Sequence, residues 1–161
     1  MRIGSALHRR LHPRDAGSDV FGHEFMGEVV EVGREVRTVS VGTRVVVPSF
    51  IACNSCWYCD HDLYSLCDTT NPNAELQSPL LGAPTAGIYG YTHEFGGYAG
   101  SHAQFVRVPF GDVNCFAVPD YVTDEQALFM SDAVPTGTWV PISATSPAVT
   151  SSRCGEPAPS G

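Results

Sequence analysis

The chain of 161 residues lacks three features that would assign it to particular classes of protein. It has no apolar run near the ~20 residues that a membrane-spanning helix needs, so no membrane is predicted as a partner. It has nine basic against 17 acidic residues and a net charge of −8, which argues against a nucleic-acid surface. Its first 15 residues are charged without an apolar core and therefore form no secretory signal. The predicted compartment is the cytoplasm.

The composition indicates one globular domain built from short elements. Hydrophobic residues make up 43% of the chain and the mean hydropathy is −0.03, both typical of a soluble fold. Sixteen glycines and twelve prolines favour strands and turns over long helices. Valine-rich strands with turns at 33–35 and 42–43 are predicted in 25–48, a loop with one hairpin in 69–100, and further strands in 103–110 and 113–119. A helix is predicted in 120–134, where Thr123 and Gln126 can form a capping box.

Four cysteines lie within fifteen positions, in the pattern C-x2-C-x2-C-x7-C: Cys53, Cys56, Cys59 and Cys67. Reduced thiols at such spacing can surround Zn²⁺ in a closed tetrahedral shell. An iron–sulfur cluster is the main alternative, because the first three cysteines match a ferredoxin spacing. The fourth cysteine lies too far away and no proline follows it, so structural zinc is favoured. His61 lies inside this loop and is interpreted as a bystander that faces solvent.

Residues 22–36, GHEFMGEVVEVGREV, fit the pattern G-H-E-x2-G-x5-G-x2-V. Together with the cysteine loop that follows, the stretch resembles the N-terminal catalytic domain of zinc-containing medium-chain alcohol dehydrogenases, over about residues 3–139. VPFGDVNCFAVP and SDAVPTG are similar to the branch that includes the glutathione-independent formaldehyde dehydrogenases. The resemblance implies a mainly β, GroES-like, partly open barrel with a structural-zinc lobe and little helix.

The resemblance also implies roles for individual residues. His23 falls on a ligand of the catalytic zinc, Glu24 on an occasional or outer ligand, and Asp132 on the third protein ligand of this branch. The four cysteines fall on the ligands of the structural zinc. The catalytic ion would polarise a carbonyl, or lower the pKa of an alcohol, before hydride passes between substrate and NAD(P).

The start of the chain departs from the family pattern. Ser5 and His8 match the proton-relay positions, but Ile3 stands where relatives have their first zinc ligand, and isoleucine binds no metal. Ala6 replaces an aspartate that supports the ligand histidine, a loss that typically costs 10- to 100-fold in affinity or activity. Residues 1–140 are therefore interpreted as a GroES-like domain that is truncated at its N-terminus and has an incomplete catalytic zinc shell.

Residues 141–161 are rich in Ser, Pro, Gly and Thr and are predicted to be a disordered, low-complexity tail. No G-x-G-x-x-G turn for NAD(P) occurs in the chain, so the nucleotide is expected to bind only in an intact relative. With GC-rich codons, a shifted reading frame over residues 156–161 spells G-x-G-x-x-G. Our hypothesis is that the tail is translated out of frame.

These patterns predict a zinc-binding fragment of an alcohol or formaldehyde dehydrogenase-like oxidoreductase that is inactive alone. The expected partners are a small alcohol or aldehyde and, as a candidate assembly, further copies of the chain. The alternative is a stand-alone, non-enzymatic zinc module that docks to a partner protein. Reduction of NAD by an alcohol or aldehyde would distinguish the first function from the second, and a brown colour would indicate an iron–sulfur protein.

Overall fold

The computed structural model describes residues 2–3 and 20–144. Ser5, His8 and most of the predicted tail lie outside this part of the chain. A five-stranded sheet has the order β6-β1-β2-β3-β7, and β4 pairs with β5 in a second sheet. The strands are β1 (Arg2–Ile3), β2 (Phe25–Val29), β3 (Arg44–Val47), β4 (Phe50–Ile51), β5 (Gly87–Ile88), β6 (Phe105–Val106) and β7 (Phe116–Ala117). The described strands form an open sheet with β6 and β7 at its edges.

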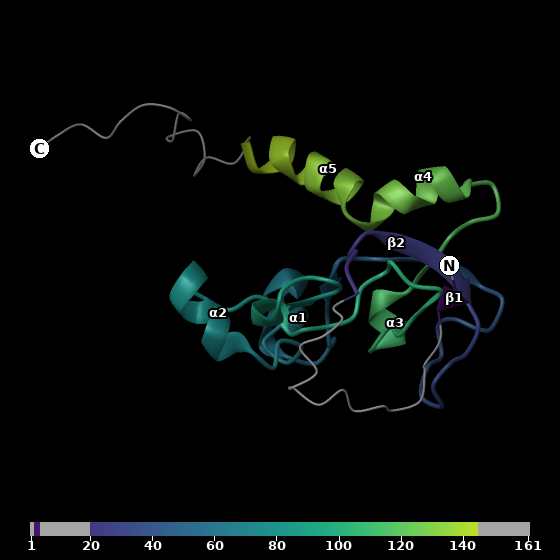
Figure 1. The fold of residues 1–161 in the computed structure, drawn as a ribbon. Helices are drawn as coiled ribbons and strands as arrows, with labels where there is room; N and C mark the ends of the chain where they lie inside the picture. Colours follow the sequence, from purple (N-terminus) through teal and green to yellow (C-terminus); the bar gives the residue numbers. More distant parts are fainter. Residues whose placement is uncertain (1, 4–19, 145–161) are drawn as a thin grey trace, which may run out of the picture.

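In the described part of the chain, five helices and three 3-10 turns accompany the strands (Figure 1). The helices are α1 (Trp57–Asp60), α2 (Ala74–Leu81), α3 (Gly111–Asn114), α4 (Asp124–Leu128) and α5 (Ala133–Ala144). The turns are η1 (Tyr64–Leu66), η2 (His93–Phe95) and η3 (Phe129–Ser131). In Figure 1, α4 and α5 run along one side of the molecule, across β2 from α1, α2 and α3. No described helix has the length and apolar character needed to cross a membrane.

The β2–β3 pair confirms two of the predicted valine-rich strands, whereas residues 36–41, between the two predicted turns, form no strand. The two strands are antiparallel, with Phe25 opposite Val47. Alternate residues of each strand are buried because side chains along a strand point to opposite faces of the sheet. The buried side chains meet Ile51, Tyr89 and Val106 in the main core. This core supports the segment just before β2, which carries the GHE sequence.

The predicted helix after residue 120 is present and has the predicted start. Thr123 accepts a hydrogen bond from the Gln126 amide, and the Gln126 side chain accepts one from the Thr123 amide. This capping box satisfies amides at the helix start. Helix α4 ends at Leu128, and the chain continues through η3 into α5. Asp132 therefore lies at the junction between two helical segments.

Two further segments differ from their predictions. Residues 111–114 form α3, and only Phe116–Ala117 remain as a strand. Within the predicted loop, residues 74–81 form α2, whose inward side chain is Gln77 at 0% exposure. Gln77 bonds the side chains of Asn71 and Thr85. Helix α2 is held by buried polar contacts, so it lacks the apolar periodicity by which helices are predicted from sequence.

Candidate metal sites

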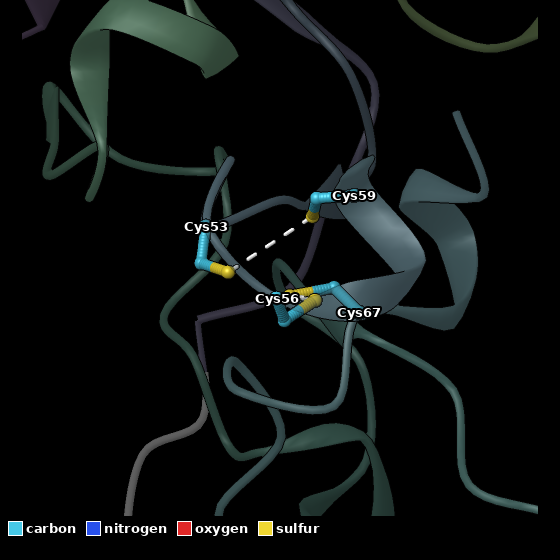
Figure 2. A group of neighbouring side chains, drawn as sticks. All are labelled: Cys53, Cys56, Cys59 and Cys67. Carbon is cyan, nitrogen blue, oxygen red and sulfur yellow. Dashed lines mark hydrogen bonds between the residues drawn. The ribbon is translucent and has the colours of Figure 1, made fainter. Parts of the chain in front are cut away.

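The four cysteines form one cluster in the lobe after β4. Cys56 and Cys59 lie on one turn of chain because α1 starts directly after Cys56, and Cys67 directly follows η1. Figure 2 shows the four side chains turned toward one another. The Sγ atoms of Cys53 and Cys59 are 3.9 Å apart, and those of Cys56 and Cys67 are 3.8 Å apart. Four sulfurs bound tetrahedrally to Zn²⁺ at ~2.3 Å lie about 3.8 Å from one another. The cluster therefore has the dimensions of a structural zinc site.

The surroundings of the cluster suit a closed metal site. Cys53, Cys59 and Cys67 are buried, and Cys56 is partly buried. Burial raises the pKa of the Cys59 thiol to about 12. For Cys53 the effect of burial is outweighed by hydrogen bonds from Ser55 and Thr69, so its pKa falls to about 6. A bound cation would favour the thiolate form of all four, which is the form that binds metal.

A second group of metal-binding side chains comprises His23, Glu24 and Asp132, each with one ligand atom within 4.8 Å of the others. His23 Nε2 is 3.9 Å from Glu24 Oε1 and 3.8 Å from Asp132 Oδ2. The His23 and Asp132 side chains are 36% and 27% exposed, so the group is open to solvent on one side. Three protein ligands with an open position are the usual arrangement of a catalytic zinc site.

Backbone contacts hold the segment that carries His23 and Glu24. Gly100, Ser101 and His102 donate hydrogen bonds to the carbonyls of residues 20–22, at 2.6–2.9 Å. Gly22 has φ +99°, and a Cβ atom there would lie 2.5 Å from Ser101 Oγ. A Cβ atom on Gly90 would lie under 3 Å from the Gly22 backbone. Three segments of the chain, residues 20–22, the turn at Gly90 and residues 100–102, therefore approach one another more closely here than side chains allow.

Neighbouring side chains also orient Asp132 and His23. Thr136 Oγ1 donates a hydrogen bond of 2.9 Å to Asp132 Oδ1, which leaves Oδ2 to face His23. The Tyr91 ring packs edge-on against the His23 ring, with centroids 5.8 Å apart. Such contacts fix the orientation of ligands around an ion.

A cavity of about 440 Å³ opens beside His23 and Glu24, lined also by Phe21, Tyr91, Thr92 and His102. Tyr91 and His102 have no role predicted from the sequence, and neither belongs to a recognisable motif. His102 is not part of the metal-binding group, but it borders the same cavity. Its position follows from the contact of residues 100–102 with residues 20–22, and that of Tyr91 from the close approach of Gly90 to Gly22.

Ile3, His61 and Cys115 are not part of either group of metal-binding side chains. Ile3 pairs with Val29, at the far end of β2 from Glu24, about 16 Å away at ~3.3 Å per residue. His61 is exposed and stacks on Trp57, as expected for a bystander. Cys115 is partly buried against the main core. Ser5 and His8 lie outside the described residues.

Comparison with known proteins identifies the class to which this fold and these sites belong. The family described as "Alcohol dehydrogenase GroES-like domain" matches residues 5–120. The chain belongs to this family, and thus to the zinc-type alcohol dehydrogenase-like oxidoreductases.

Two curated relatives and one solved structure illustrate the similarity. The chain is 40% identical over 115 residues to a zinc-type alcohol dehydrogenase-like protein of Schizosaccharomyces pombe, covering 71% of the chain and 27% of the relative. It is 37% identical over 122 residues to a glutathione-independent formaldehyde dehydrogenase of Pseudomonas aeruginosa, covering 73% and 28%. The structure of an alcohol dehydrogenase from Thermus sp. ATN1 superposes with a TM-score of 0.67 at 34% identity, covering 78% of the chain and 32% of that protein. The chain thus spans a third or less of the length of these relatives.

Proposed function

We propose that this chain forms the metal-binding catalytic domain of an NAD(P)-linked alcohol or aldehyde dehydrogenase, with structural zinc at the four cysteines. The observation that carries the proposal is the meeting of His23 and Glu24 with Asp132, which lies far along the chain. A divalent ion held there has an open position where an alcohol or aldehyde oxygen can bind. The relatives, which are alcohol and formaldehyde dehydrogenases by name, support the same substrate class.

The chain's own residues would bind and orient the substrate. His23, Glu24 and Asp132 would hold the ion, which would supply Lewis-acid polarisation of the substrate oxygen. The rings of Phe21 and Tyr91 line the adjoining cavity and can contact the carbon skeleton of the substrate. His102 and Thr92, also in the lining, bring polar groups to the same space. The cavity size of about 440 Å³ is within the usual range for small-molecule sites.

Hydride transfer also needs a nicotinamide site. The 161 residues contain no G-x-G-x-x-G turn, the usual fingerprint for binding a dinucleotide. We therefore expect the 161-residue chain to bind zinc and substrate but not to reduce NAD(P)⁺ by itself.

The test uses the purified 161-residue chain reconstituted with zinc. Co²⁺ is then introduced at the solvent-open site of His23, Glu24 and Asp132. Metal analysis should find two ions per chain, and a short alcohol or aldehyde should perturb the visible spectrum of the Co²⁺ at the His23 site. His23→Ala should abolish the second ion and the spectral response while the first ion remains. One ion per chain with no response to alcohol would instead favour the zinc module. Reduction of NAD⁺ would contradict the expected lack of a nicotinamide site.

A further inference from the structure

The sulfur atoms of the cysteine cluster make two direct contacts with one another. Cys53 Sγ lies 3.9 Å from Cys59 Sγ, the contact drawn as a dashed line in Figure 2, and Cys56 Sγ lies 3.8 Å from Cys67 Sγ. Four cysteines allow three different disulfide pairings. The two contacts favour the pairing of Cys53 with Cys59 and of Cys56 with Cys67. In each pair a movement of about 1 Å by each sulfur brings the two to the disulfide bond length of about 2 Å.

Each of these pairs joins an accessible cysteine to a buried one. Cys56 is partly exposed, whereas its partner Cys67 is fully buried. Cys53 borders a cavity of about 970 Å³, whereas its partner Cys59 is buried and does not line that cavity. Oxidation of a cysteine depends on its exposure and its thiolate character. A molecule as small as hydrogen peroxide can therefore reach one sulfur of each pair, and a second sulfur lies in contact with the first.

The surroundings of Cys53 favour its reactive form. The backbone amide and the hydroxyl of Ser55 both donate hydrogen bonds of 3.4 Å to Cys53 Sγ. Such bonds stabilise negative charge on the sulfur, and the thiolate is the nucleophilic form of cysteine. Cys115 lines the same cavity but is not part of the cluster. The cavity therefore offers a control thiol beside the reactive one.

We propose that the four cysteines are a modification site for peroxides. Hydrogen peroxide converts them into the Cys53–Cys59 and Cys56–Cys67 disulfides, and the zinc ion leaves. The inference rests on the part of the proposed function that assigns zinc to the cysteines, and it is independent of the group formed by His23. It goes beyond that function because it gives the cysteine site a redox chemistry of its own.

Each disulfide forms in two steps that consume one molecule of hydrogen peroxide. The thiolate of the accessible cysteine attacks a peroxide oxygen, so an S–O bond forms, the O–O bond breaks and hydroxide leaves. The thiolate of the buried cysteine then attacks this sulfenic sulfur, so the S–S bond forms, the S–O bond breaks and a second hydroxide leaves. The two hydroxides take up two protons from the solvent. Two electrons pass from the sulfurs to the peroxide, and the zinc ion leaves as Zn²⁺.

Release of the ion follows from the loss of its ligands. The thiolate is the form of cysteine that binds metal, so one disulfide removes two of the four ligands. The buried apolar part of this lobe contains, besides three of the cysteines, only Ala52 and Ala86. The two disulfides would then replace the ion as the cross-links of residues 53–67.

The test uses the full 161-residue chain loaded with one equivalent of zinc. Hydrogen peroxide is added in steps, and a chromophoric chelator reports the zinc that is released. The remaining thiols are alkylated at each step, and peptide mass spectrometry locates the disulfides. We expect one zinc to be released per chain, with both disulfides inside the same chain. Reduction by a phosphine should restore zinc binding, because disulfides are reversible whereas sulfinic acids are not.

Two variants serve as controls. The double variant Cys115→Ser/Cys154→Ser removes the two cysteines outside the C-x2-C-x2-C-x7-C motif and should release zinc as wild type does. His23→Ala should also release the same amount, which shows that the measured ion comes from the cysteines.

The outcomes separate this inference from the proposed function. If zinc stays bound in an excess of peroxide, the inference is wrong and the zinc assignment stands. The same holds if zinc leaves with a different pairing, with disulfides between chains, or without recovery after reduction. If the cysteines of the untreated chain bind no zinc, the inference and that part of the proposed function both fail.

Discussion

Replacement of Cys67 by serine should remove most of the stability of the cysteine lobe. Cys67 is fully buried, with its sulfur 3.8 Å from that of Cys56. The buried part of the local apolar cluster is Ala52, Ala86 and three of the cysteines, with Phe50, Cys56 and Val113 partly buried against it. At about 0.8 kcal/mol per buried CH₂, the five small buried side chains contribute about 4 kcal/mol. Structural zinc contributes roughly 10–16 kcal/mol in small zinc peptides, so the ion outweighs this cluster.

Divided over four ligands, that binding energy is about 2.5–4 kcal/mol for each cysteine. Cys67→Ser should therefore weaken zinc binding by about two to three orders of magnitude. Competition with a chromophoric chelator measures the affinity, and hydrogen exchange should show loss of protection across residues 52–86. Cys115→Ser, at a cysteine outside the cluster, should keep zinc. Wild-type zinc affinity in Cys67→Ser would refute the assignment of the four cysteines as one metal shell.

Three further changes test the contacts around the two sites. Asp112 accepts three hydrogen bonds from the loop facing it, chiefly backbone ones, which hold the pKa of its carboxyl below the ordinary 3.8. Because the folded-state pKa is lowered, Asp112→Asn should lower the urea midpoint at neutral pH. The difference from wild type should persist down to about pH 3.8 and shrink as the pH falls further, through the lowered folded-state pKa. Asn114→Ala leaves the buried amide and carbonyl of Ala52 without their partner, at a cost of about 1–3 kcal/mol each. Unfolding in urea should therefore show that the free energy of unfolding falls by about 2–6 kcal/mol, and a fall of under about 1 kcal/mol would contradict this. Gly90→Ala, at φ +54°, should displace the turn that carries His23 and reduce Co²⁺ binding at the His23 site. An unchanged affinity would show that the turn does not control the site.

The cysteine site, whose four ligands lie close together in the sequence, could be predicted from the local pattern alone. The four cysteines lie within one loop, so their spacing determines that they can reach one ion. The same holds for the capping box at Thr123 and for the alternating valines of the β2–β3 hairpin. Each of these features depends on residues a few positions apart, and period-2 and capping signals act over that distance.

Features held by polar side chains escaped that kind of prediction. The side chain that α2 buries is a glutamine, Gln77. Helix α3 replaces the start of a predicted strand, where Asn114 bonds the Pro109 carbonyl and the backbone of Ala52. Neither contact has a sequence period, because the partners come from other parts of the chain. The apolar pattern that reveals strands and helices reports only on burial of apolar faces.

What the sequence by itself determined is the family, the cysteine site and the valine hairpin, because these rest on contiguous motifs. The resemblance implied that Asp132 joins His23, but the physical reason lies in the tertiary structure, because the junction between η3 and α5 has to lie beside the turn before β2. The fold also placed two residues without a predicted role around the same cavity: His102 through hydrogen bonds between residues 100–102 and 20–22, and Tyr91 next to Gly90, which packs closely on Gly22. The geometry around the second ion is therefore a long-range property, because it depends on which segments the folded core holds together.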